Sequence, residues 1–76
     1  MKFSLDHASQ QIKEIQQCLS ENKDRPHLTH EQVKELCRDL ATIRQVLCLF
    51  SFIGLDEHKA DSLKERCTGT IEVYNP

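Results

Sequence analysis

The feature that most constrains the fold is an apolar run near the middle of the chain, residues 43–53 (IRQVLCLFSFI), in which eight of eleven residues are apolar. If the run is helical, these side chains point in nearly every direction around the axis, and a helix that is apolar on all sides must be buried on all sides. A chain of 76 residues makes one domain with a marginal core. We therefore expect two neighbouring helices to cover part of the run, and a twin subunit or another protein to cover the rest.

The sequence before the run predicts that the run is the second half of one long helix. Apolar residues recur at intervals of three and four from Val33 to Phe50, and no Gly or Pro follows until Gly54. Thr29 with Gln32 three residues later is the pattern of a capping box, which marks a helix start. We predict a helix over residues 30–52 that ends at Gly54, where glycine accepts the left-handed conformation.

Two further helices are predicted on either side of it. In the first, five apolar residues follow the helical spacing after a potential N-cap at Ser4, which predicts a helix over residues 4–21. The residues of this stripe are Leu5, Ala8, Ile12, Ile15 and Leu19. The polar segment 21–28, with Pro26, is predicted to be the connector.

The last part of the chain is less strongly patterned. Ala60, Leu63 and Cys67 predict a short helix over residues 57–67, which would begin at the N-cap Asp56 and stop at Gly69. Because this helix is weakly apolar, we expect it to act as a lid on the core. Residues 70–76 are predicted to be an extended tail.

An α+β alternative stays open at this point. A short apolar run cannot be assigned to helix or strand by periodicity alone, and residues 45–53 are rich in β-branched and aromatic side chains. Residues 70–74 (TIEVY) alternate like a strand and could pair with them. We favour the all-α fold, a helical hairpin with a short third helix, because two strands would form a thin sheet.

The charge balance of the chain, the length of its apolar run and its N-terminal sequence argue against nucleic-acid binding, a membrane span and secretion. Ten Lys and Arg are balanced by twelve Asp and Glu, for a net charge of −2, so no basic field favours nucleic acid or anionic lipid. A membrane span needs about 20 apolar residues, whereas the run has eleven and includes Arg44. The N-terminus lacks the apolar core of a secretory signal, and we expect a cytoplasmic protein.

The cysteines and histidines give no strong signature of chemistry. Without a secretory signal, the default for the four cysteines is reduced thiols that pack as small hydrophobic residues, although a disulfide or a metal site is also open. They are Cys18, Cys37, Cys48 and Cys67. His27 and His30 with Cys18 and Cys37 lack the paired spacing of a structural zinc site. We expect two solvated histidines, inert thiols at Cys37 and Cys48, no cofactor and no enzymatic activity.

By elimination, the sequence favours a small protein-binding module that acts as an adaptor, an inhibitor or a regulatory subunit of a larger complex. We expect a homodimer and an interface on the helix of residues 30–52. The interface residues would be Ile43, Val46, Leu47, Leu49, Phe50, Phe52 and Ile53. The alternative is a nucleic-acid-binding transcriptional regulator that uses the helix of residues 57–67, whose His58, Lys59, Lys64 and Arg66 are interleaved with acidic residues.

Overall fold

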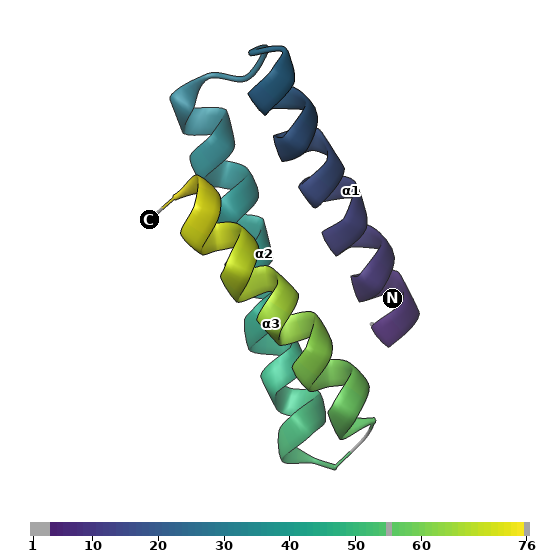
Figure 1. The fold of residues 1–76 in the computed structure, drawn as a ribbon. Coiled ribbons are helices and arrows are strands. Elements are labelled where there is room, and N and C mark those ends of the chain that lie inside the picture. The colour runs from purple at the N-terminus through teal and green to yellow at the C-terminus, as the bar shows by residue number, and fades with distance from the viewer. Residues whose placement is uncertain (1–3, 55, 76) are drawn as a thin grey trace.

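Three helices make up the part of the chain that the structure describes. The computed structural model describes residues 4–54 and 56–75, and for Ser51 the backbone only. The helices are α1 (Leu5–Asp24), α2 (His30–Phe52) and α3 (Glu57–Tyr74), each antiparallel to the next in an elongated bundle of 40 × 25 × 17 Å (Figure 1). The all-α prediction is confirmed. The α+β alternative is wrong, since residues 45–52 lie in α2, residues 70–74 lie in α3 and no described residue forms a strand.

The first helix begins where the sequence predicts and ends three residues later than expected. Ser4 is the N-cap, and its hydroxyl oxygen accepts a hydrogen bond of 3.1 Å from the backbone N–H of His7. The helix continues to Asp24 and ends at Arg25, which is extended, because the following proline disfavours the helical conformation at that position.

The connector between α1 and α2 is held by a side chain that the sequence analysis did not single out. The amide oxygen Oδ1 of Asn22 accepts hydrogen bonds of 2.8 Å from the backbone N–H groups of both His27 and Leu28. These bonds join the last turn of α1 to the residues just before α2. They satisfy two backbone donors that would otherwise depend on water.

The predicted capping box is present at the start of α2. The backbone N–H of Gln32 donates to Thr29 Oγ1 (3.1 Å), and the backbone N–H of Thr29 donates to Gln32 Oε1 (2.8 Å). At the other end, Gly54 has a φ of 76°, the left-handed conformation that ends the helix. Both predicted boundaries of α2 are confirmed.

The third helix is longer than predicted, and the extended tail is a wrong prediction. Instead of ending at Cys67, α3 passes through Gly69 and continues to Tyr74; Pro76 lies outside the described residues. Thr70 is buried, and its Oγ1 donates to the carbonyl of Arg66 in the preceding turn (2.8 Å) while accepting from Gln16 Nε2 of α1 (2.9 Å). Packing of this last segment against the other helices overrides its weak helix propensity.

The start of α3 also differs in detail from the prediction. Asp56 occupies the N-cap position, but its backbone is left-handed with a φ of 44°, and its carboxylate makes no capping hydrogen bond. A side-chain cap requires an extended backbone at this position. The acidic residue is therefore placed at the helix start without acting as its hydrogen-bonded cap.

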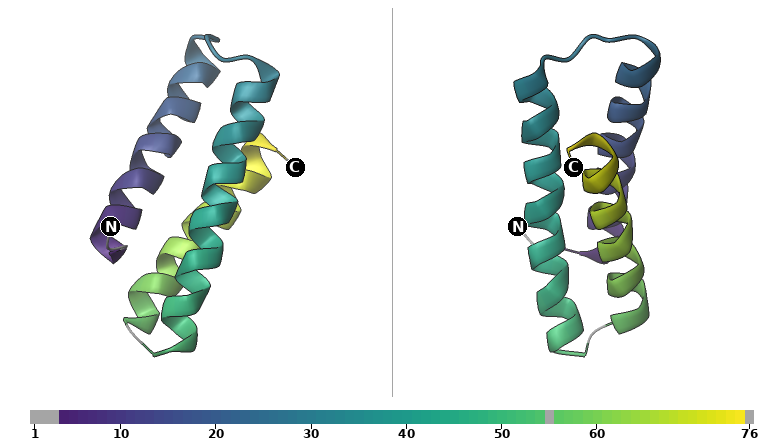
Figure 2. Two further views of the ribbon diagram at one scale, coloured as in Figure 1. Left: turned by 180° about the vertical axis from the view of Figure 1, so that it is seen from behind. Right: turned by 60° about the vertical axis from the view of Figure 1, so that its left-hand side comes forward.

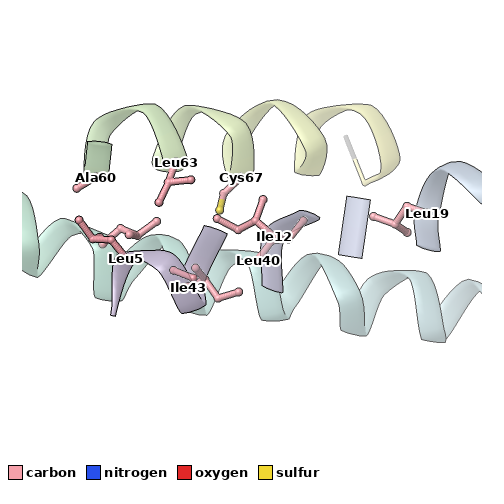
Figure 3. Close-up of a cluster of buried hydrophobic side chains, with 10 residues drawn as sticks. Leu5, Ile12, Leu19, Leu40, Ile43, Ala60, Leu63 and Cys67 are labelled. Carbon is pink, nitrogen blue, oxygen red and sulfur yellow. The ribbon is translucent and has the colours of Figure 1, made fainter. Parts of the chain in front are cut away.

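The core lies along the line where the three helices meet (Figure 3). It is formed by Leu5, Ala8, Ile12, Leu19, Leu40, Ile43, Leu47, Ala60, Leu63 and Cys67. Partly buried side chains, among them Ile71 and Tyr74, extend this core along α3. Because α2 packs more extensively against α3 than against α1, the third helix is the main partner of α2 and not the minor lid that its sequence predicted.

Candidate protein-binding surface

The seven residues predicted to form an interface separate into three groups by exposure. Ile43 and Leu47 are buried, Val46 and Phe50 are half-buried, and Leu49, Phe52 and Ile53 are exposed. The first pair belongs to the core of the chain itself, and the half-buried Phe50 packs against that core. Ile43 and Leu47 are thus removed from the candidate surface by burial.

The three exposed residues form what we call the α2 apolar patch: Leu49, Phe52 and Ile53. Side chains three and four positions apart lie on the same side of a helix, so the three are neighbours on the outward side of α2. Phe52 is 88% exposed, and the other two are each 62% exposed. Exposed apolar side chains that occur singly need no explanation, but three adjacent ones at a helix end mark a candidate interaction surface.

The position of the patch follows from the lengths and offsets of the helices. The last turns of α2 and the first turns of α3 extend beyond the N-terminal end of α1 in each view (Figures 1 and 2). As a result, α1 does not cover this end of α2. The patch lies on the side of α2 that faces away from the shared core.

The rest of the outward side of α2 changes in character along the helix. The exposed positions of its first half are mostly charged and end with Arg38 and Asp39, whereas the described exposed positions that follow carry no charge. We call these later positions, through the end of the helix, the uncharged face: Thr42, Gln45, Cys48, Leu49 and Phe52. Charge returns just after the turn, at the exposed Asp56 and Glu57. Depletion of charge is typical of the centre of a protein interface.

Another exposed apolar side chain lies far from the α2 apolar patch. Val73 of α3 is 63% exposed and lines a hollow of about 210 Å³ with Leu19, Val33 and Tyr74, near the connector between α1 and α2. The hollow is below the size of about 300 Å³ at which ligand pockets begin. We therefore assign no ligand to it.

The cysteines are four free thiols with different environments. Cys37 and Cys67 are buried, Cys18 is half-buried and Cys48 is exposed. Burial raises the pKa of the Cys37 and Cys67 thiols and so lowers their thiolate fraction. The burial of Cys37 agrees with the inert character predicted for its thiol. Cys48, which is also predicted to be inert, is exposed and is not part of the core.

Metal ligands do not gather in the described part of the chain. No group of three or more His, Cys, Asp or Glu side chains there is close enough to hold a metal ion. His27 and His30 are both exposed, as predicted, and the ring Nδ1 of His27 lies 3.0 Å from the carbonyl oxygen of Arg25.

Three of the four basic side chains of α3 on which the nucleic-acid alternative depends, Lys59, Lys64 and Arg66, are engaged within the fold, whereas His58 is exposed. Lys59 Nζ lies 2.6 Å from Asp6 Oδ1 of α1, and Lys64 Nζ lies 2.9 Å from Asp61 Oδ1. The Asp6 pair lowers the pKa of the carboxyl and raises the pKa of the lysine, because each charge stabilises the other. Arg66 Nη2 donates to a side-chain oxygen of α1 at 2.9 Å.

The outer side of α3 is correspondingly acidic. Its exposed acidic residues are Glu57, Asp61, Glu65 and Glu72. Three of these, Asp61, Glu65 and Glu72, border a shallow hollow of about 480 Å³. Lys64 borders the same hollow but is paired with Asp61, so the net charge of this surface is negative and it repels phosphate groups.

None of the three helices, over the residues that the structure describes, combines the length and the apolar character that a membrane span requires. Comparison of the chain with protein-family models, with curated proteins and with solved structures found no match in any of the three.

Proposed function

We propose that the chain is a non-enzymatic protein-binding module, an adaptor, inhibitor or regulatory subunit, that acts through the α2 apolar patch. The observation that carries this proposal is the joint exposure of Leu49, Phe52 and Ile53 at the projecting end of α2. Large aromatic and aliphatic side chains exposed together supply the anchors that protein interfaces bury. The uncharged face around them lowers the desolvation cost of a partner's approach.

The three residues of the α2 apolar patch lie outside the core cluster of the chain. The core is complete on the opposite side of the helix, where Leu40 and Leu47 have no solvent exposure. Three large side chains that contribute little to the core are a liability for solubility unless a partner covers them. This supports an interaction surface in preference to a structural role for the patch.

The proposal is tested with the tagged full chain in an extract of the cells that express it. The wild type is compared with Phe52→Asp, which places a charge in the patch, and with Ser62→Asp, a charge added at an exposed position of α3. Both substitutions are at exposed positions and should change the free energy of unfolding by less than about 0.5 kcal/mol.

We expect proteins that are retained by the wild type and by Ser62→Asp to be lost with Phe52→Asp. Circular dichroism is used to check that the wild type and both variants are folded. If Phe52→Asp retains the same proteins as the wild type, the patch is not the binding surface and the proposal is wrong.

A further inference from the structure

We infer that α1 is a hinged strap on the hairpin of α2 and α3. It undocks as one unit at a hinge between Leu28 and Thr29, while α2 and α3 stay helical and paired. Undocking uncovers an apolar face of the hairpin, whose members in the core are Leu40, Ile43, Leu47, Ala60, Leu63 and Cys67. This face lies on the other side of α2 from the α2 apolar patch, so the strap is independent of the proposed function.

The packing between the three helices is unequal. The contact of α2 with α3 is more extensive than the contact of either helix with α1. Along the apolar stripe of α1, position 8 is a small alanine and Ile15 is only half-buried. Because the apolar area removed from water is the main stabilisation of such contacts, α1 is held less strongly than α2 and α3 hold each other.

A hollow separates part of α1 from α2. Its volume is about 360 Å³, and it is lined by Gln11 and Ile15 of α1 and by Asp39, Thr42 and Ile43 of α2. Three of these five side chains are polar, so the hollow is suited to water. The facing isoleucines therefore lack the packing contacts that a closed interface between α1 and α2 would give them.

The contact of α1 with α3 includes polar anchors that water can replace. Gln16 Nε2 donates to Thr70 Oγ1, and Arg66 Nη2 donates to Gln16 Oε1, both at 2.9 Å. Near the start of α1, Asp6 pairs with Lys59 at an exposed position. When α1 leaves, all of these groups can bond to water, so the net cost of breaking the anchors is small.

The hydrogen bonds of the connector divide it into two parts that move with different helices. Asn22 of α1 accepts from the backbone N–H groups of His27 and Leu28, which ties these residues to α1. Thr29 and Gln32 form the capping box, which ties Thr29 to α2. The junction of Leu28 and Thr29 is where the two parts meet, so α1 can swing there without loss of either set of bonds.

The test is hydrogen exchange of the full chain, measured by mass spectrometry of its peptides at several urea concentrations below the unfolding transition. A lone helix of 20 residues is marginal in water, so the amides of undocked α1 exchange. We expect residues 11–19 of α1 to exchange at least about tenfold faster than residues 36–47 of α2. The exchange of α1 should also depend less on urea, because undocking exposes less surface than complete unfolding. Both segments lie away from the helix ends, so end fraying does not contribute.

Two matched variants separate undocking from complete unfolding. Gln17 of α1 and Gln45 of α2 are both exposed, and glycine at either position weakens its own helix by a similar amount. Gln17→Gly should accelerate exchange in both segments by about threefold, because α1 is lost in the undocked and in the unfolded state. Gln45→Gly should accelerate exchange in α2 by the same factor and leave α1 unchanged, because α2 stays helical when α1 undocks.

Two results would overturn the hinged strap. One is a wild type in which both segments exchange at the same rate and with the same dependence on urea. The other is an equal acceleration of α1 and α2 by Gln45→Gly, since all three helices would then open together. Neither result bears on the binding of proteins through the α2 apolar patch, which the extract experiment tests separately.

Discussion

Leu47 and Leu49 lie two residues apart in the same helix, yet Leu47 has no exposed surface and Leu49 is 62% exposed. The two side chains are chemically identical, and composition places both in one apolar run. Their positions around the helix differ by about 200°, at 100° per residue, so one faces α1 and α3 and the other faces away. The comparison teaches that the second half of α2 contains two surfaces, an inner one that packs in the core and an outer one that is exposed to solvent.

The largest expected contrast between the two surfaces is in thiol reactivity. Cys37 is buried and Cys48 is exposed on the same helix, and Cys67 is buried on α3. Iodoacetamide should modify Cys37 and Cys67 at least about a thousandfold more slowly than Cys48, because a buried thiol reacts only after an opening of the fold. Their raised pKa acts in the same direction, since fewer of these thiols are thiolate near neutral pH.

Mass spectrometry of the peptides after timed labelling gives each rate separately. The same experiment in urea is the control, in which the three rates should converge. Similar rates in the folded protein would contradict the division of α2 into an inner and an outer surface.

The next largest effect is on stability. Leu47→Ala should lower the free energy of unfolding by about 2–5 kcal/mol, because it removes a fully buried side chain and leaves a cavity between the helices. Urea unfolding followed by circular dichroism measures the change. A loss below about 1 kcal/mol would mean that this position is much less tightly packed than its burial indicates.

Phe50 lies between the two surfaces, since it is half-buried and packs against the core. We expect Phe50→Ala to lower the free energy of unfolding by about 1–3 kcal/mol, less than the 3–5 kcal/mol typical of a fully buried phenylalanine. The same urea titration measures it. An effect as small as that of an exposed residue would move Phe50 into the α2 apolar patch and enlarge the outer surface.

The smallest effect on stability is expected for Leu49→Ala, the counterpart of Leu47→Ala. The free energy of unfolding should change by no more than about 0.5 kcal/mol, because the side chain is mostly in solvent. The tagged variant should also retain less of the proteins that the wild type retains from the cell extract. A loss of stability comparable with that of Leu47→Ala would contradict the assignment of Leu47 to the inner surface of α2 and of Leu49 to the outer surface.

Much of α2 could be predicted from the sequence because its signals are local. The capping box needs only Thr29 and Gln32, and Gly54 ends the helix through its own backbone conformation. The inward stripe is also marked in the sequence by its intervals of three and four: Val33, Leu36, Leu40, Ile43, Leu47 and Phe50. All six are buried or half-buried. Within residues 43–53 the same periodicity separates the buried Leu47 from the exposed Leu49.

The end of α3 could not be predicted from local preferences. Gly69 and the β-branched residues around it disfavour a helix, whereas the hydrogen bond from Gln16 to Thr70 joins residues 54 positions apart. Such a contact is absent from any short window of sequence. The intervals from Cys67 to Ile71 and on to Tyr74 are nevertheless helical, and they were the available signal for the longer α3.

The extensive packing of α2 against α3 has a consequence for how the chain folds. These two helices are neighbours in the sequence and are separated by a turn of four residues, so their association closes a short loop at low entropic cost. Proteins whose contacts are mainly local fold in microseconds to milliseconds. We expect the α2–α3 hairpin to form the folding nucleus and α1 to dock afterwards, so that substitutions at the α2–α3 contact slow folding while those on α1 mainly accelerate unfolding.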